Sequence, residues 1–379
     1  MSAINQMFVG LFGAVGSVVS GLTNLIDTWY PVRNGAALSR VKWLGDGKFW
    51  AAYDQGILKN STDGKTWTPV FAGRTGTVSA AFNDVAYNPD SATNGLPKYM
   101  AVGAGIVFTS NDGITWTQAT LPSAGVTLLS VVWNSTFGRF FTISASFLWS
   151  STNGAAWTTI GVTGTVNGLV SAGSTVICTT STNIVRVTSA TTATTAYNKP
   201  STASAITSVA LAADGVTGVA TMLNDSTTNP GGTSQPLILK TINSGTAWSV
   251  VANGNLVVTW GTFATSAFVG DKFVCYYRGS SSLPITYTVD TAVTTVTYSA
   301  YNASASTMPL QSFASHPSYS PDLGLTAGAV SSSLPADPVI STDGVMFGQS
   351  YSVPVAAIGQ AATATSTGVY EKLNRSEEH

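Results

Sequence analysis

Ser61-Thr62-Asp63-Gly64-Lys65-Thr66-Trp67 is a short motif that returns along the chain. Ser110–Trp116 repeats it almost unchanged, and Ser151–Trp157 has Asn in place of Asp. Two further copies are Thr241–Trp248, which is one residue longer, and Ser341–Phe347, which ends on Phe. A motif that recurs in this way within 379 residues indicates a repeat architecture.

The motif combines the residues of a tight turn with a large aromatic residue, and we call it the turn motif. Ser, Thr, Asp and Asn side chains accept hydrogen bonds from backbone N–H groups slightly further along the chain, and Gly adopts a positive φ without steric cost. The closing aromatic ring is buried between neighbouring repeats, which contributes about 1.5–3 kcal/mol. The predicted role is structural, and it falls to Ser61, Asp63, Gly64, Trp67, Ser110, Asp112, Gly113, Trp116, Ser151, Asn153, Gly154, Trp157, Asn243, Gly245, Trp248, Ser341, Asp343, Gly344 and Phe347.

The spacing of the closing aromatic residues gives the period of the repeat. Two gaps are about twice as long as the others, and Tyr197 and Tyr298 lie near their midpoints. With these two residues included, the steps run from 40 to 51 residues. Repeats of this length that hold several short strands are typical of β-propellers, in which each repeat is one blade. The seven aromatic markers therefore predict seven blades.

The turn motif resembles the Asp-box, or BNR repeat, of sialidases and other β-propellers. The resemblance covers residues 38–350, although most copies are one residue shorter than the usual Ser-x-Asp-x-Gly-x-Thr-Trp of the family. It implies that each motif lies on the connection between the third and fourth strands of a blade, away from any active site. The predicted fold is all-β, a seven-bladed β-propeller of four-stranded antiparallel blades.

The propeller is predicted to occupy residues 40–353. A helix at 1–28 and a connector at 29–39 precede it, and an extension at 354–379 follows it. Almost no helix is expected beyond the N-terminal segment. In the first blade the strands are predicted at Val41–Leu44, Phe49–Tyr53, Ile57–Ser61 and Trp67–Phe71.

The N-terminal segment carries no charge over residues 1–26. It does not begin with the Lys or Arg of a secretory signal. The face opposite its apolar stripe is small and polar, which is unlike a membrane span. An apolar stripe follows alternating spacings of four and three residues, the seam of a coiled coil. We predict that this helix docks with copies of itself or with a larger assembly; the alternative is membrane insertion, because residues 10–16 resemble glycine-rich viral fusion peptides. The seam residues are Ile4, Phe8, Leu11, Val15, Val18, Leu22 and Leu25.

The charge content excludes several classes of partner. Charged residues make up 9% of the chain and the net charge is −1, so long-range electrostatics favours neither nucleic acid nor an anionic membrane. Cys178 and Cys275 lie in apolar runs and are predicted to be buried free thiols. With His316 and His379 the only histidines, we expect no metal site and no cofactor.

The resemblance to sialidases implies a set of catalytic residues: an arginine triad, a tyrosine activated by glutamate, and an aspartate. The ring offers arginines only on separate blades: Arg40, Arg74, Arg139, Arg186 and Arg278. All glutamates follow the ring: Glu371, Glu377 and Glu378. Glycoside hydrolysis needs two carboxylates close together. Most aspartates of the ring, Asp84 among them, lie beside Gly, Asn or Pro, and we interpret them as residues that cap turns. We predict no enzymatic activity; a sialidase-like glycan-processing enzyme is the alternative.

The longest connections between second and third strands lie on the face opposite the turn motifs, on adjacent blades. They are Asn224–Pro236, Arg278–Pro284 and Ser331–Pro338. Loops on a rigid scaffold commonly carry recognition, so this face is the predicted binding surface. Its candidate binding residues are Asn224, Asp225, Asn229, Arg278, Ser281 and Asp337.

A low-charge β-rich body behind an uncharged docking helix resembles bacteriophage structural proteins of the tail fibre, spike or head-decoration type. The expected place is the exterior of the virion. The expected partners are other virion proteins, or a second copy of this chain, at the N-terminal helix, and a host surface glycan at the propeller. Many copies on one particle would strengthen weak host attachment through avidity.

Overall fold

The computed structural model describes residues 38–53, 56–62, 67–72, 81–199, 205–225, 235–251, 261–269, 272–279, 285–291, 296–300, 310–315, 324–328 and 339–341. The predicted N-terminal helix, the connector except its last two residues, and the C-terminal extension lie outside these ranges. Within them the regular secondary structure is β-strand, apart from the four-residue α-helix α3 (Ser91–Asn94).

The strands form antiparallel sheets of consecutive strands, six of four strands and one of three. The first three sheets are β1 (Leu38–Trp43), β2 (Phe49–Tyr53), β3 (Ile57–Ser61) and β4 (Thr68–Ala72); β5 (Phe82–Tyr87), β6 (Tyr99–Gly103), β7 (Ile106–Ser110) and β8 (Thr117–Gln118); and β9 (Ser130–Asn134), β10 (Arg139–Ile143), β11 (Leu148–Ser151) and β12 (Thr158–Ile160).

The later sheets repeat this order. They are β13 (Val166–Ala172), β14 (Thr175–Thr180), β15 (Asn183–Val187) and β16 (Ala193–Asn198); β17 (Ala205–Leu211), β18 (Gly218–Asp225), β19 (Gln235–Thr241) and β20 (Ser249–Val250); β21 (Gly261–Val269), β22 (Lys272–Gly279), β23 (Ile285–Asp290) and β24 (Val296–Ala300); and β25 (Leu310–Ser315), β26 (Gly324–Gly328) and β27 (Val339–Ser341).

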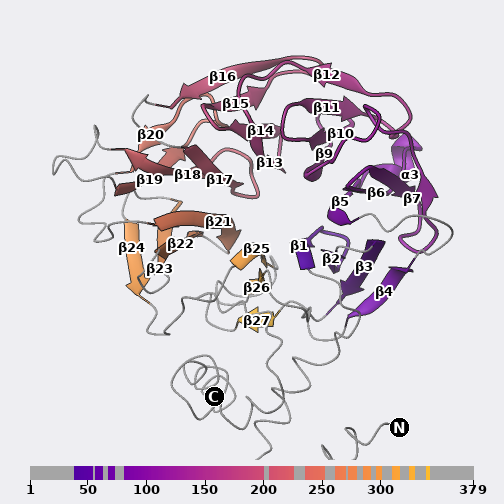
Figure 1. The fold of residues 1–379 in the computed structure, drawn as a ribbon, viewed down its shortest axis with the longest axis horizontal. Helices are drawn as coiled ribbons and strands as arrows, with labels where there is room; N and C mark the ends of the chain where they lie inside the picture. Colours follow the sequence, from indigo (N-terminus) through magenta and orange to yellow (C-terminus); the bar gives the residue numbers. More distant parts are fainter. Residues whose placement is uncertain are drawn as a thin grey trace, which may run out of the picture.

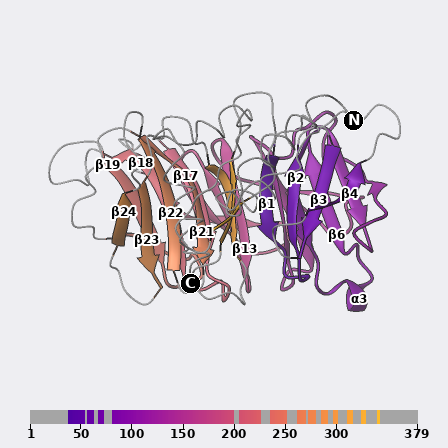
Figure 2. The same ribbon diagram turned by 90° about the horizontal axis from the view of Figure 1, so that it is seen from below.

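The sheets are arranged in chain order around a common centre (Figure 1). The first strand of each sheet lies innermost and contacts the first strands of the sheets before and after it, and β25 contacts both β21 and β1. Seen from the side, the strands run through the thickness of the disc (Figure 2). Each sheet is therefore covered by a neighbour on each of its two faces.

Residue alternation explains why both faces are apolar. Along β2, Phe49, Ala51 and Tyr53 pack with Val41 on one face of the sheet. Trp50 and Ala52 point the other way, into a cluster with residues of the second sheet such as Phe82. Since successive side chains of a strand point to opposite faces, a strand between two neighbours is buried at every position, as β2 is.

The turn motif at Ser110–Trp116 is closed by its own side chains. Ser110 Oγ accepts the backbone N–H of Gly113 at 2.9 Å, and Asp112 Oδ1 accepts those of Ile114 and Thr115, both at 2.7 Å. These backbone hydrogen bonds lower the pKa of Asp112 well below its ordinary value. Gly113 has φ +76°, the left-handed conformation that glycine adopts without strain.

Two more copies of the turn motif share this pattern. Ser151 Oγ accepts the N–H of Gly154, and Thr241 Oγ1 accepts that of Gly245, at 2.9 and 3.1 Å. Both glycines have positive φ, and in the longer copy Ser244 does as well, at 59°. Residues 63–66 and 342–347 lie outside the described part of the chain, so the first and last copies are not compared.

The described strands agree closely with the predicted ones in the first sheet, where β2 and β3 have the predicted bounds. β1 begins three residues earlier than predicted, and β4 begins one residue after Trp67. The connection between β5 and β6 contains α3. Cys178 and Cys275 are free and buried, as predicted, and burial raises the pKa of each thiol to about 12.

Gly113 gives a test of the turn motif, because a Cβ there would lie 3.1 Å from the rings of both Trp50 and Tyr99. We expect Gly113→Ala to lower the free energy of unfolding by more than the roughly 1–2 kcal/mol of a left-handed alanine. Gly125→Ala is the matched control, since Gly125 has φ +69° and open space around it. Chemical denaturation of both variants measures the difference, and equal losses would show that the ring contacts contribute nothing.

Candidate functional site

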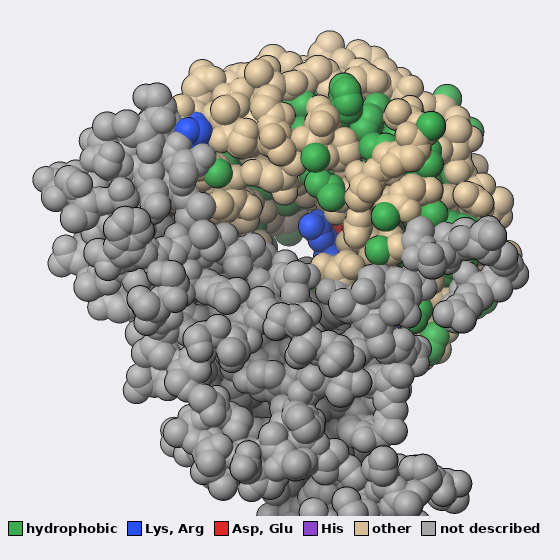
Figure 3. Space-filling view, viewed as in Figure 1, with side chains coloured by type: hydrophobic (Ala, Val, Ile, Leu, Met, Phe, Trp, Pro, Cys, Tyr) green, Lys and Arg blue, Asp and Glu red, His purple; other side chains and the backbone are tan. Residues whose placement is uncertain are grey.

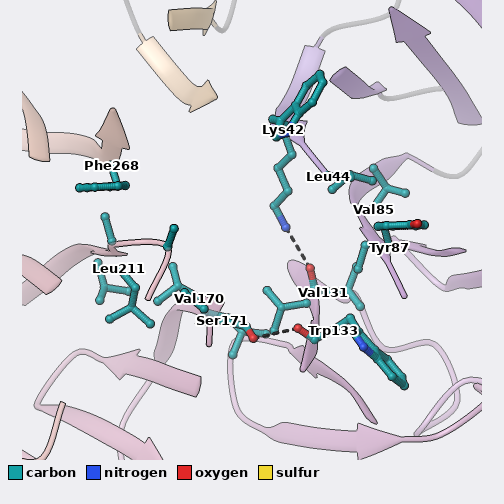
Figure 4. Close-up of a pocket in the computed structure, with 18 of the residues that line it drawn as sticks. Lys42, Leu44, Val85, Tyr87, Val131, Trp133, Val170, Ser171, Leu211 and Phe268 are labelled. Carbon is teal, nitrogen blue, oxygen red and sulfur yellow. Dashed lines mark hydrogen bonds between the residues drawn. The ribbon is translucent and has the colours of Figure 1, made fainter. Parts of the chain in front are cut away.

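A cavity of about 550 Å³ lies at the centre of the described sheets. Its wall comes from the first strands of six sheets, at or next to the last residue of each strand (Figure 4). In the space-filling view the middle of the described surface is hollowed, with a Lys or Arg side chain in the hollow (Figure 3). The wall residues that represent the six strands are Trp43, Tyr87, Trp133, Ala172, Leu211 and Phe268.

The strand register fixes the end of the disc at which this cavity lies. In the second sheet, Tyr87 at the end of β5 pairs with Tyr99 of β6, which pairs with Ser110 at the end of β7. Ser110 begins a turn motif, so the cavity and the turn motifs share one end of the disc. The described strand ends that flank two of the predicted binding loops, Asp225 of β18 and Gly279 of β22, lie at the other end.

The cavity wall is mostly apolar. Its apolar residues include Trp43, Val131, Val170, Leu211 and Phe268, several of which Figure 4 labels. Ser171 is a polar exception, and its hydroxyl donates to the carbonyl oxygen of Trp133 at 2.8 Å. Lys42 is the one charged side chain among the described wall residues.

Lys42 belongs to a cluster of charged and polar groups, which we call the Asp84 cluster: Arg40, Lys42, Asp84 and Ser130. Asp84 Oδ2 accepts from Lys42 Nζ at 2.7 Å, from Ser130 Oγ at 2.6 Å and from Arg40 at 3.2 Å. It also accepts the backbone N–H of Val131 at 2.9 Å, while Oδ1 accepts that of Val85. The carboxylate is completely buried and fully hydrogen-bonded.

The two cations differ from Asp84 in exposure. The side chains of Arg40 and Lys42 are 32% and 24% exposed, whereas that of Asp84 is 0% exposed. Burial alone raises the pKa of Asp84, but the charges of Lys42 and Arg40, with the hydrogen bonds from Lys42 and Ser130, outweigh it and hold this pKa below its ordinary value. Burial lowers the pKa of Lys42, and the charge of Asp84 opposes that shift.

The Asp84 cluster connects three sheets. Arg40 and Lys42 lie on β1, Asp84 on β5, and Ser130 on β9; Lys42 also donates to the carbonyl oxygen of Val131 at 2.9 Å. Other inner strands are joined by neutral polar contacts. Asn167 of β13 donates to the carbonyl oxygen of Ile206 on β17, and Ser208 of β17 bonds to Ser266 of β21 at 2.9 Å. The Asp84 cluster thus joins inner strands as these contacts do, but through charged side chains.

Similar solved structures identify the architecture. No family model matches this sequence, and no curated protein sequence is detectably similar to it. Virginiamycin B lyase from Staphylococcus aureus has a TM-score of 0.59 at 10% identity, covering 83% of this chain and 97% of that one. YCF48 from Cyanidioschyzon merolae has 0.58 at 13% identity, covering 83% and 98%. The Swd1 β-propeller domain from Myceliophteria thermophila has 0.55 at 10% identity, covering 83% and 98%.

The chain has the β-propeller fold. At these identities the similarity establishes the fold alone, and the similar structures include both a lyase and a protein bound to a peptide. The function therefore has to be argued from the residues of this propeller.

The candidate binding residues are only partly described. Asn224 and Asp225 end β18, at the end of the propeller away from the cavity, and Arg278 lies in β22. Asn229, Ser281 and Asp337 lie outside the described residues, as do all seven residues of the N-terminal seam. Whether these loops form one surface stays a prediction.

The prediction that Asp84 caps a turn is wrong, because Asp84 is a buried residue within β5. The roles of Lys42 and Ser130 were not predicted from the sequence. One signal was present: two cations, Arg40 and Lys42, stand two residues apart in a strand of a chain with few charges. Residues at that spacing share one face of a strand.

The described residues contain no group of three or more His, Cys, Asp or Glu side chains placed to hold a metal ion. No helix among them is long and apolar enough to cross a membrane.

Loss of the Asp84 carboxylate should destabilise the propeller strongly. Asp84→Asn keeps the shape of the side chain but leaves two cations without their counter-charge, so we expect the free energy of unfolding to fall by about 3–5 kcal/mol. Asp214→Asn is the control: Asp214 is exposed and accepts the N–H of Val216, which an Asn oxygen also accepts, so its effect should stay within about 0.5 kcal/mol. If Asp84→Asn lowered the free energy of unfolding by less than about 1 kcal/mol, Asp84 would not be important for holding the three sheets together.

The same cluster predicts a pH dependence. The pKa of Asp84 in the folded protein lies below its ordinary value of 3.8, so its stabilising contribution is complete above that value and is lost as the pH falls toward the folded pKa. We expect the stability difference between wild type and Asp84→Asn to be constant above about pH 5 and to shrink below about pH 4. Urea unfolding of both proteins across this range measures it, and a constant difference would show that Asp84 does not carry the effect.

Proposed function

We propose that this protein is a non-enzymatic virion structural protein of the phage fibre, spike or head-decoration type. In this proposal the N-terminal helix attaches the chain to the particle, and a seven-bladed propeller contacts the host surface. The observation that carries the non-enzymatic part is the state of Asp84, the buried carboxylate beside the central cavity.

Asp84 is unsuited to acid–base chemistry. A general acid or base has to change its protonation state near the working pH, whereas Asp84 is kept ionised by Lys42 and Arg40. Both of its oxygens already accept hydrogen bonds from within the propeller. Glycoside hydrolysis needs a second carboxylate near the first, and the described wall of the cavity offers none. The arrangement favours a scaffold that binds.

Attachment to a particle is supported by the sequence. The seam from Ile4 to Leu25 is apolar and the segment around it is uncharged, which suits burial against other helices. Its four glycines at positions 10, 13, 16 and 21 make an isolated helix unstable, so the segment depends on packing. A helix with these properties serves as an anchor that folds upon assembly.

The fold is compatible with binding. One of the similar structures is of YCF48 bound to D1 peptide, so a propeller of this shape holds a ligand in that protein. In the present chain, the loops at Asn224–Pro236, Arg278–Pro284 and Ser331–Pro338 remain the proposed host-contacting surface. A surface of this kind works through many weak contacts on one particle.

The count of seven blades is part of this proposal. Seven sheets are described, and the last of them, β25 to β27, has three strands. The aromatic marker Phe347 follows β27 by six residues, just as Trp67 follows the end of β3. A fourth strand after Phe347 would complete the seventh blade.

The anchor is tested in the full-length protein by two substitutions that add the same charge. Leu11→Asp places a carboxylate in the apolar seam, and Ser17→Asp places one on the polar face. Because a buried, unpaired charge is costly, we expect Leu11→Asp to abolish incorporation into particles and Ser17→Asp to retain it. The measurement is the amount of the protein that sediments with purified particles.

The other outcomes separate the alternatives. Equal incorporation of both variants would rule out docking through the seam. Leakage of liposomes caused by wild type and Ser17→Asp, but not by Leu11→Asp, would favour the membrane-active alternative over particle assembly. Circular dichroism of each variant checks that the propeller is folded.

A further inference from the structure

We propose that the central cavity is a binding site for a small carboxylate with a flat apolar body, and that Lys42 binds its carboxylate. None of the described wall residues belongs to the segments proposed as host-contacting loops or as the N-terminal anchor. The site rests on the proposed function in one respect: the ligand is bound and not converted.

The net charge of the Asp84 cluster favours binding of an anion. Arg40 and Lys42 carry two positive charges, and Asp84 carries one negative charge, so the cluster has a net charge of about +1 in a largely buried place. An anion in the cavity would neutralise this excess. A cation there would add to it.

Lys42 has the capacity to bind such a group. Its ammonium donates to Asp84 Oδ2 at 2.7 Å and to the carbonyl oxygen of Val131 at 2.9 Å. An ammonium has three N–H donors, so one is left for a ligand. Figure 4 shows the Lys42 side chain extending along the cavity toward Val131, with its nitrogen at the wall. The remaining exposure of this side chain, 24%, belongs to a residue that lines the cavity.

The rest of the cavity suits an apolar body. Apolar side chains of different sheets line it, among them Trp43, Val131 and Phe268. A volume of about 550 Å³ falls within the range of small-molecule sites, which runs from roughly 300 to 1,000 Å³. A mostly apolar wall with one charged group is typical of sites in which a single polar contact orients the ligand.

The wall is also rigid enough to be formed in advance. Lys42 is fixed by two acceptors, and Ser171 is held by the carbonyl oxygen of Trp133. Because the wall residues come from neighbouring strands of the ring, the ligand does not have to order a loop. A preformed site binds without the cost of ordering mobile side chains.

The experiment compares two probes of the same shape, 2-naphthoate and its neutral amide, 2-naphthamide. Isothermal titration calorimetry with the full-length protein should show that naphthoate binds about tenfold or more tightly than naphthamide, because a hydrogen bond to a charged group is worth at least that factor. In Lys42→Gln, which keeps a hydrogen-bond donor but removes the charge, this preference should fall to about onefold.

Each outcome of these titrations either supports or overturns the proposed carboxylate site. Equal binding of the two probes to wild type, binding of neither, or an unchanged preference in Lys42→Gln would overturn the proposal. The comparison of probes on wild type stands even where Lys42→Gln folds poorly, and Lys42→Arg, which keeps the charge, should retain the preference. Chromatography of the recovered probe separates the two proposals: a converted ligand would contradict the non-enzymatic function while leaving the site in place.

Discussion

Each sheet of this protein depends on being covered on both faces. A four-stranded sheet such as β1 to β4 buries Phe49, Ala51 and Tyr53 on one face and Trp50 and Ala52 on the other, so it cannot be stable with either face in water. A ring of sheets around one centre meets this requirement for every sheet, since each is both a cover and a covered element. The turn motif, the inner-strand contacts and the cavity all follow from that arrangement.

The Asp84 cluster is the exception within this apolar architecture. A carboxylate with no exposed surface is costly unless it is paired and fully hydrogen-bonded, and Asp84 is both. Its two cations come from the preceding sheet, and two of its hydrogen bonds, from Ser130 and Val131, come from the following sheet. Such a group therefore selects one relative position of three sheets, which apolar contacts alone specify less sharply.

Local patterns in the sequence predicted the strands and turns well, because those features depend on neighbouring residues. The apolar run Phe49–Tyr53 and the turn residues around Gly113 each carry their own structural information. The Asp84 cluster could not be predicted in the same way, since Arg40, Asp84 and Ser130 are more than forty residues apart from one another. Their meeting depends on the lateral order of the sheets. The cavity was missed for the same reason: its wall takes one or a few residues from each of six strands, and apart from Lys42 none of them is unusual in its own strand.

The position of the Asp84 cluster in the chain has a mechanical consequence. The N-terminal segment leads directly into β1, so a pull on that segment enters the described structure at Leu38, two residues before Arg40 and four before Lys42. From these two side chains the load passes through Asp84 to the second sheet and through Ser130 and Val131 to the third. A protein held at its N-terminus would thus spread tension over three sheets at once, where a single edge strand would otherwise be peeled away first.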